Sequence, residues 1–252
     1  MNLLLLEPGE IDAGVVRLHD GRAAHLRTVL AVVPGQTVRV GVIEGPIGVG
    51  TVTAVSPETV ALACTFAEVP PRPAVDLLLA LPRPKVLQRL WAQCAALGVG
   101  RIVLTNAAKV ERPYFDTHVL DPATYRALLL DGLQQARDTR VPVVSVHRQF
   151  RPLIEDHLDT LCPRGLRIVA DPSAEASVSA VVAGVAPGAP DDGRVVLAVG
   201  PEGGWNSFEL DLLAQHGFVR ATLGERTLRS DTACIALLAV VHEGVRIRAV
   251  RR

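Results

Sequence analysis

Two short segments late in the sequence combine glycines with charged side chains, a pattern typical of ligand-binding loops. Val195–Val199 is an uninterrupted apolar run that predicts a buried strand, and Gly-Pro-Glu-Gly-Gly follows at residues 200–204. A second segment, residues 223–232, carries two arginines and an aspartate and leads into a strongly apolar stretch. Glycine lets the backbone approach a ligand closely, and ligands bind where parallel strands end. The two segments therefore predict one small-molecule pocket at the C-terminal edge of a parallel sheet.

The first segment matches neither of two common nucleotide-binding motifs. It lacks the G-x-G-x-x-G spacing of dinucleotide sites, and no Gly-Lys-Ser/Thr follows it as in a phosphate-binding loop. It offers backbone N–H and C=O groups and one carboxylate, Glu202, at the rim. Such groups suit a ligand with an adenine edge and a ribose but no phosphate chain. Taken alone, the segment fits equally well a tight strand-to-helix turn in which glycine only supplies a positive φ.

The composition favours an α/β protein. Of the 252 residues 49% are hydrophobic and only 4% aromatic, and the formal net charge is zero, so bulk charge gives no argument for nucleic acid. The cations are nearly all arginine, which suits phosphate contacts but equally reflects a genome that prefers arginine codons. The four cysteines form no C-x-x-C pair and predict reduced, buried thiols. No histidine pair has metal-ligand spacing, so we expect no metal.

No apolar stretch approaches the ~20 residues that a membrane span requires, and the Leu3–Leu6 run is too short for a signal peptide. We therefore expect a soluble, cytoplasmic protein without membrane contact.

The Pro-Pro-Arg-Pro stretch at residues 70–73 is the clearest linker. Before it, Val-rich runs at Thr37–Val42, Ile47–Val55 and Thr59–Phe66 alternate with Gly/Pro turns and predict a small antiparallel barrel or sheet. One helix over Ala23–Val33 is expected to pack against it.

After the linker, apolar strands alternate with helices, which predicts a parallel sheet covered on both faces. The expected strands are Val75–Leu81, Ile102–Thr105, Val141–Val146, Arg167–Ala170 and Val195–Val199. The expected helices are Val86–Leu97, Pro122–Arg137, a capping-box helix from Asn206 to Gln215, and Thr232–Val241 with Ser230 as N-cap. The stretch Ala183–Arg194 is expected to be a surface loop.

Together, Gly-Pro-Glu-Gly-Gly at residues 200–204 and Leu-Gly-x-Arg-x-Leu-Arg at residues 223–229 resemble the two signature loops of the ribosomal RNA small subunit methyltransferase E family, in the SPOUT superfamily. Asp231-Thr232-Ala233 continues the second motif, and shorter matches near residues 25–35, 95–99 and 134–142 extend the resemblance over most of the chain. The chain departs from the family pattern at Arg83–Arg89 and at Glu111–Pro113.

The resemblance implies a PUA-like RNA-binding domain over residues 1–72 and a SPOUT methyltransferase domain, with a C-terminal trefoil knot, over residues 73–252. It also implies a homodimer that binds S-adenosylmethionine and methylates N3 of a uridine in 16S ribosomal RNA of the small ribosomal subunit. The departures leave two alternatives open. One is a methyltransferase for another RNA site, and the other is a non-catalytic RNA-binding or ribosome-assembly factor with the same fold.

Within this resemblance, Arg229, with Arg226 as second choice, is expected to stabilise negative charge on the uracil. Glu202 is the candidate proton acceptor or, alternatively, an anchor for the donor's ammonium group. Trp205 is a candidate for stacking on a base. The residues expected to hold the donor are Asp171, Pro172, Gly200, Pro201, Glu202, Gly203, Gly204, Leu223, Gly224, Leu228 and Thr232. The expected RNA contacts are Arg17, Arg22, Arg27, Arg83, Lys85, Arg89, Arg112 and Arg140.

Overall fold

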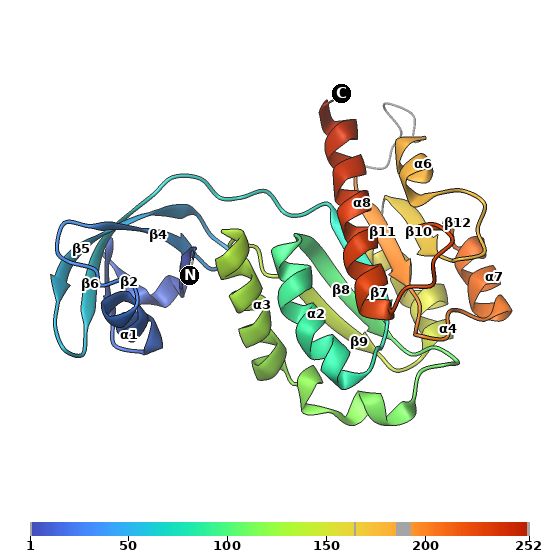
Figure 1. Cartoon of the computed structure of the whole chain (residues 1–252), viewed down its shortest axis with the longest axis horizontal. Helices are drawn as coiled ribbons and strands as arrows, with labels where there is room; N and C mark the ends of the chain where they lie inside the picture. The colour runs from blue at the N-terminus through green and yellow to red at the C-terminus, as the bar shows by residue number, and fades with distance from the viewer. Residues whose placement is uncertain (1, 164, 185–192, 251–252) are drawn as a thin grey trace. The chain divides into compact units, whose positions relative to one another are not determined.

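The computed structural model describes residues 2–163, 165–184 and 193–250, which form two compact units (Figure 1). The first unit comprises Met1–Arg72 together with Leu129–Val141, and the second comprises Pro73–Leu128 with Pro142–Arg252. Each unit contains its own six-stranded sheet. Nothing in the sequence pattern indicates that the stretch from Leu129 belongs with the first unit, because it begins inside an expected helix.

The sheet of the first unit has the strand order β1-β4-β5-β6-β3-β2. Its strands are β1 (Leu4–Leu6), β2 (Ile11–Asp12), β3 (Val15–Leu18), β4 (Thr37–Val42), β5 (Ile47–Val55) and β6 (Val60–Phe66). The β1–β4 pair is parallel and the other neighbours are antiparallel, so the sheet is mixed, and the expectation of an antiparallel sheet is wrong for β1. Strand β1 is not predictable from the sequence pattern, because its three leucines are all buried and show no period-2 alternation.

Helix α1 (Gly21–Thr28) packs in this unit and is shorter than expected. Its N-terminus is fixed by Asp20, whose side chain accepts a hydrogen bond from the Arg22 N–H at 2.9 Å. The expected continuation to residue 33 fails at Ala31, whose φ of 46° is left-handed. The apolar pattern after residue 28 misled the prediction, since Val29 is 65% exposed.

The last residues of the Leu129–Val141 stretch are bonded to the turn between β4 and β5. The Thr139 hydroxyl donates to Gly45 O at 2.7 Å, the Glu44 N–H donates to Thr139 O at 2.9 Å, and the Val141 N–H donates to Glu44 Oε1 at 2.7 Å. These bonds explain why the stretch belongs to the first unit.

The sheet of the second unit is entirely parallel, as predicted, with the order β12-β10-β11-β7-β8-β9. Its strands are β7 (Val75–Ala80), β8 (Val99–Thr105), β9 (Val143–His147), β10 (Leu166–Ala170), β11 (Val195–Val199) and β12 (Phe218–Ala221). Every residue of β7 and β11 is buried, which accounts for the uninterrupted apolar sequence of β11. In β7 the one charged residue, Asp76, is buried and pairs with Arg194. Strand β12 is absent from the predicted strands, because it is only four residues long and two of its residues are exposed.

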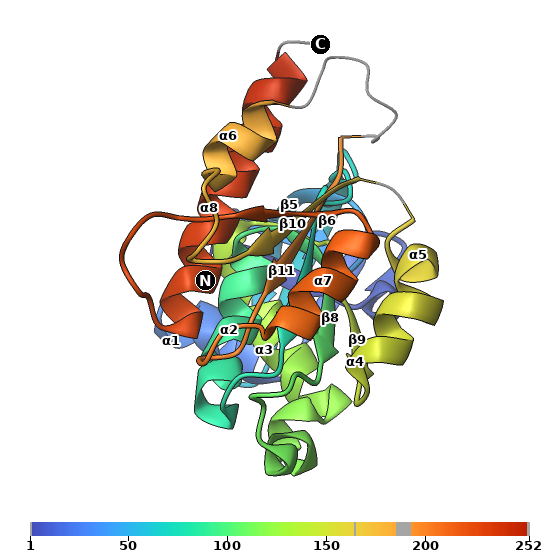
Figure 2. The ribbon, with the colours of Figure 1, turned by 90° about the vertical axis from the view of Figure 1, so that its right-hand side faces the viewer.

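Helices cover both faces of this sheet, again as predicted: α2, α6 and α8 lie on one face, and α4, α5 and α7 on the other (Figure 2). The helices that begin in this unit are α2 (Pro84–Ala96), α3 (Pro122–Ala136), α4 (Phe150–Pro152), α5 (Leu158–Leu161), α6 (Val178–Ala183), α7 (Ser207–Gln215) and α8 (Ser230–Val250). Shorter turns of helix are η1 (Pro8–Glu10) in the first unit and η2 (Arg112–Asp116), η3 (His118–Leu120) and the π-helical η4 (Leu153–His157) in the second.

Helix α8 is longer at both ends than the expected Thr232–Val241. The helix continues past Gly244 to Val250. This glycine allows α6 and α8 to pack closely, because a Cβ at this position would lie 2.3 Å from Val182 Cγ1 of α6. Of the expected surface loop Ala183–Arg194, residues 185–192 lie outside the described residues. Cys64, Cys94, Cys162 and Cys234 are buried and free. No helix among the described residues combines the length and the apolar character needed to cross a bilayer.

Candidate functional site

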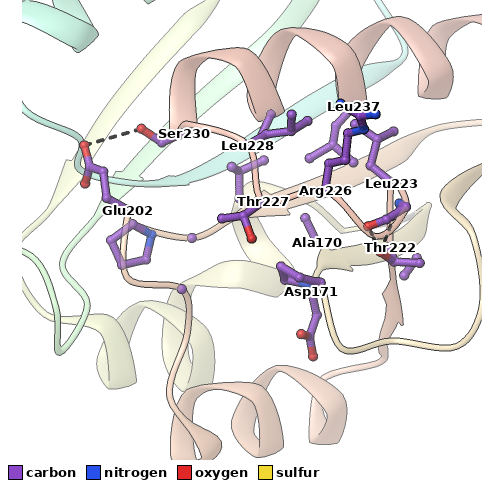
Figure 3. A pocket seen from close by; sticks show the side chains of 18 residues that line it. Ala170, Asp171, Glu202, Thr222, Leu223, Arg226, Thr227, Leu228, Ser230 and Leu237 are labelled. Atoms are coloured by element: carbon purple, nitrogen blue, oxygen red, sulfur yellow. Dashed lines mark hydrogen bonds between the residues drawn. The ribbon is translucent and has the colours of Figure 1, made fainter.

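A cleft of about 700 Å³ lies at the C-terminal edge of the second unit's sheet, where β10, β11 and β12 end and α8 begins (Figure 3). Both segments singled out in the sequence line this cleft. The predicted donor-binding residues found in its wall are Asp171, Pro172, Gly200, Pro201, Glu202, Gly204, Leu223, Gly224 and Leu228.

The loop after β11, residues 200–206, is held in place by its own hydrogen bonds. The Gly204 N–H donates to Pro201 O at 2.8 Å, and Gly204 adopts a φ of 70° that favours glycine. The predicted capping box is confirmed: the Asn206 side chain accepts from the Glu209 N–H, and the Glu209 carboxylate accepts from the Asn206 N–H, each at 2.8 Å. The loop therefore enters α7 with its backbone fixed on both sides.

The loop after β12, residues 222–229, has fewer internal bonds. The Thr222 hydroxyl donates to Gly224 O and accepts from the Gly224 N–H, both at 3.1 Å, and Gly224 has a φ of 127°. Residues 223–229 are all exposed. Among the described residues, the backbone groups of Leu223 and Leu228 make no hydrogen bond. These N–H and C=O groups are available to a ligand with hydrogen-bonding edges.

The segment after β10 forms the third wall and is bonded to the end of β12. Its backbone contacts are Asp171 N to Ala221 O at 3.0 Å and Thr222 N to Ala176 O at 2.8 Å. The buried carboxylate of Asp171 points away from the loop that bears Thr227 and Leu228 (Figure 3).

Contacts with Ser173 and Arg220 fix the charge state of the Asp171 carboxylate. Asp171 Oδ1 accepts from the N–H and hydroxyl of Ser173, and Oδ2 pairs with Arg220. Burial raises the pKa of Asp171, but the Ser173 hydrogen bonds and Arg220 outweigh it and hold that pKa below its usual value. Asp171 therefore contributes a fixed wall to the cleft, with its charge already paired.

The three candidate catalytic side chains come from different parts of the site. Glu202 lies at one end of the cleft, where Ser230 Oγ donates to its carboxylate at 3.4 Å, and Arg226 lies at the other end near Leu223 and Leu237 (Figure 3). Arg229 does not line the cleft. Its side chain is 78% exposed, and its Nε lies 3.9 Å from Asp231 Oδ1.

Asp231 joins the start of α8 to α2 beside Arg229. Its Oδ2 pairs with Arg89 Nη2 at 2.7 Å, and its Oδ1 accepts from the Thr232 N–H at 3.0 Å. Burial raises the pKa of Asp231, but the Thr232 N–H and the two arginines, Arg89 and Arg229, lower it further than burial raises it. A carboxylate that stays ionised between two guanidinium groups keeps both cations at this edge of the cleft.

Four residues near the cleft differ from their expected roles. Gly203 and Thr232, predicted to hold the donor, are not in the cleft wall. Trp205, a candidate for stacking on a base, is 8% exposed and its ring centroid lies 5.4 Å from that of Phe150, so the ring packs within the protein. Ser230 is not the N-cap of α8 but its first residue, and its hydroxyl bonds Glu202 instead.

The structure adds lining residues that the sequence analysis did not name. They are Ala170, Val199, Ala221, Thr222, Thr227, Ser230, Ala233 and Leu237. Most of them immediately precede or follow a predicted residue at a strand end or helix start. Ala221 and Thr222 could not be predicted to line the cleft, because they lie at the end of β12, a strand absent from the predicted elements.

The candidate RNA-binding cations differ in whether their side chains are already bonded to other groups of the protein. In the first unit, Arg22 pairs with Glu10 and Asp20, while Arg140 Nε donates to Pro70 O at 2.7 Å, so both bind the protein itself. Arg27 makes long bonds, each 3.3 Å, to backbone carbonyls. The other exposed candidates are Arg17 in the first unit and Arg83, Lys85 and Arg112 in the second. Arg89 is also exposed but pairs with Asp231.

No cluster of three or more His, Cys, Asp or Glu side chains that could hold a metal ion occurs within residues 2–163, 165–184 and 193–250.

A family model for the RNA methyltransferase domain matches residues 70–242. The chain is 27% identical over 250 residues to the ribosomal RNA small subunit methyltransferase E of Treponema pallidum, covering 96% of this chain and 90% of that protein. It is 26% identical over 239 residues to the enzyme of that name from Mycobacterium bovis, covering 91% and 87% of the two chains.

Among solved structures, the ribosomal RNA small subunit methyltransferase E of Neisseria gonorrhoeae, bound to S-adenosyl methionine, has the same fold. Its TM-score is 0.73 at 21% identity, and the match covers 96% of this chain and 97% of that one. The predicted α/β fold is therefore shared with a methyltransferase over nearly the whole of both chains.

Proposed function

The chain belongs to the ribosomal RNA small subunit methyltransferase E family of RNA methyltransferases, and on that premise we propose that it transfers a methyl group from S-adenosylmethionine to N3 of a uridine in 16S ribosomal RNA. One observation carries the proposal. The two loops that bear the family's signature residues, separate in sequence, line a single cleft at the C-terminal edge of a parallel sheet.

The cleft fits the proposed donor. Its wall is largely glycine, proline, alanine and leucine, as in most sites for small molecules, and its polar groups are few. The backbone groups of Leu223 and Leu228 can bond an adenine edge. Gly204, where a Cβ would meet nothing within 4 Å, leaves room for a ribose. No cation-rich phosphate cradle is needed, because this donor has no phosphate chain.

Methyl transfer to uracil N3 requires that the acceptor lose its proton, since the protonated nitrogen is a poor nucleophile. When bound, S-adenosylmethionine supplies an electrophilic methyl group on a sulfonium. Glu202 is the proposed proton acceptor, or else the group that anchors the donor's ammonium. Arg229, with Arg226 as the alternative, stabilises negative charge on O2 or O4, where one well-aimed donor contributes about 3 kcal/mol.

The positions of the charged groups support a division of roles. Glu202 and Arg226 lie at opposite ends of the cleft, so they act on different parts of the bound molecules (Figure 3). The exposed guanidinium of Arg229, beside Asp231, lies where an RNA can reach it. Asp231 keeps this arginine and Arg89 together at the rim.

The proposed function also extends to the RNA contacts and the assembly. Residues 1–72 form a PUA-like RNA-binding domain, and residues 73–252 form a SPOUT domain with a trefoil knot; the non-sequential order β12-β10-β11-β7 supports the latter. The enzyme acts as a cytoplasmic homodimer on the small ribosomal subunit. The exposed cations Arg17, Arg83, Lys85, Arg89 and Arg112 contact RNA phosphates, since RNA helices are recognised through shape and backbone.

Two measurements test the proposal. Isothermal titration with S-adenosylmethionine should show binding at the cleft, which a non-catalytic assembly factor does not require. Mass mapping of ribosomal RNA from a strain lacking the gene should reveal one missing methyl on a 16S uridine, restored by the wild-type gene. A missing methyl elsewhere would favour the alternative RNA target, and unchanged RNA would contradict the proposed activity.

A further inference from the structure

The turn that follows β8 contacts both helix α7 and the loop at residues 200–206 that precedes it. The Ala108 N–H donates to Glu209 Oε1 at 2.6 Å, and the Lys109 ammonium donates to Gly203 O at 2.5 Å. Neither contact is implied by the family motifs, because the residues that make them are about 100 positions apart in the sequence.

The first contact is buried and rigid. Glu209 is 3% exposed, and its carboxylate accepts two backbone N–H groups, one from Asn206 and one from Ala108. A buried carboxylate with both oxygens bonded is strongly held. Glu209 therefore fixes the turn after β8 at the start of α7, directly behind the Gly-rich loop.

The second contact is at the surface and reaches the Gly-rich loop itself. Gly203 does not need a positive φ, unlike its neighbour Gly204. A Cβ on Gly203 would instead lie 2.6 Å from Lys109 Cδ. The glycine thus leaves space for the lysine stem, which lies across the loop so that its ammonium reaches the Gly203 carbonyl.

We propose that Lys109 is a positioning residue for the methyl donor: it holds the Gly203 peptide, and through it the cleft-lining Gly204 and Glu202, in the geometry that binds S-adenosylmethionine. The proposal rests on the proposed function for the identity of the ligand. Lys109 itself does not line the cleft and acts only through the loop.

The test compares variants of the full-length protein by isothermal titration with S-adenosylmethionine. Lys109→Met keeps the stem but removes the donor group, and Gly203→Ala displaces the stem; each should weaken donor binding about fivefold, the effect of losing one hydrogen bond of about 1 kcal/mol. Lys109→Arg keeps a cationic donor and should stay within about twofold of wild type.

The double variant gives the sharper result. Because both single changes break the same contact, Lys109→Met with Gly203→Ala should bind no more weakly than either alone. Arg151→Met, a matched loss of an exposed cation on α4 that pairs with Glu155, should leave binding unchanged. Thermal unfolding of all variants should stay near wild type, because Lys109 is exposed.

A donor-independent measurement separates this inference from the proposed function. In the absence of S-adenosylmethionine, amide hydrogen exchange over residues 200–206 should be faster in Lys109→Met than in wild type and Arg151→Met. Unchanged exchange, unchanged donor affinity, or additive losses in the double variant would overturn the role of Lys109. Absence of donor binding by the wild-type protein would instead contradict the proposed function.

Discussion

The two loops that line the cleft differ in how the protein holds them. The loop at residues 200–206 has an internal turn, a capping box with Glu209 of α7, and a bond from Lys109 in the turn after β8; that turn also bonds Glu209. The loop at residues 222–229 has only the Thr222–Gly224 turn, and residues 223–229 are exposed. The loop at residues 200–206 is thus preorganised in the absence of a ligand, while the loop at residues 222–229 presents unpaired backbone groups that a ligand can bond.

The two loops should therefore contribute to ligand binding in different ways. A preorganised loop lowers the ordering cost of binding, and a loop with free backbone groups gains its contacts from the ligand. Changes in the first loop should therefore reduce donor affinity through geometry. Changes in the second should act through the groups it presents to the donor and the RNA.

Arg229→Ala, in the second loop, should produce the largest loss of activity. Without the group proposed to stabilise the uracil anion, turnover should fall at least about 100-fold. Donor affinity should stay within about threefold, because the Arg229 side chain is not in the cleft wall. Single-turnover methylation of ribosomal RNA and titration with S-adenosylmethionine measure the two quantities; methylation at the wild-type rate would rule out the assigned role.

Gly204→Ala should weaken donor binding about tenfold, since a Cβ at a φ of 70° costs roughly 1–2 kcal/mol in the held loop. Gly217→Ala is the matched control: its φ is 82°, but it lies after α7 and outside the cleft wall. Both variants should lose similar stability in urea unfolding, and only Gly204→Ala should lose donor affinity. Equal affinity losses in the two would mean that the first loop has no special role.

Glu209→Gln should lower the free energy of unfolding by about 2 kcal/mol, because the amide NH₂ would face a buried N–H donor. Ser230→Ala removes only the 3.4 Å bond to Glu202 and should cost less than about 0.5 kcal/mol. Urea unfolding of both variants compares the stabilisation by the Glu209 hydrogen bonds with that by the Ser230–Glu202 hydrogen bond. If Ser230→Ala were the more destabilising change, the assignment of rigidity to the first loop would be wrong.

The last prediction is a pH dependence of stability that arises from Asp171. Its pKa is lowered in the folded protein, so its stabilising contribution is present above its ordinary pKa of 3.8 and is lost as pH falls through the lower, folded value. Wild type should be more stable than Asp171→Asn at pH 7, and the difference in the free energy of unfolding should shrink below about pH 4. A difference that grows on acidification would contradict the paired state of Asp171.

The sequence predicted the second unit better than the first. Uninterrupted apolar runs such as Val195–Val199 identify strands buried on both faces, and the Asn206 and Glu209 pair marks a helix start by local chemistry. In the first unit, Val29 and Val33 continue an apolar pattern but lie on the surface after α1 has ended. Local pattern cannot distinguish an apolar residue that packs from one that tertiary structure leaves exposed.

The candidate site was predicted where local motifs define it. Gly200, Gly204, Leu223 and Leu228 all lie in the wall of one cleft. The contact between Lys109 and Gly203 could not be predicted, because it depends on the order of strands in the sheet and not on any spacing along the chain.

A crystal structure of the protein with S-adenosylmethionine would test most directly whether the two loops form one donor site. We expect the donor between the loops, with its adenine bonded to backbone groups of Leu223 and Leu228 and with residues 200–206 in the conformation they have without it. A donor bound elsewhere, or a Gly-rich loop that rearranges while residues 223–229 stay fixed, would contradict this expectation.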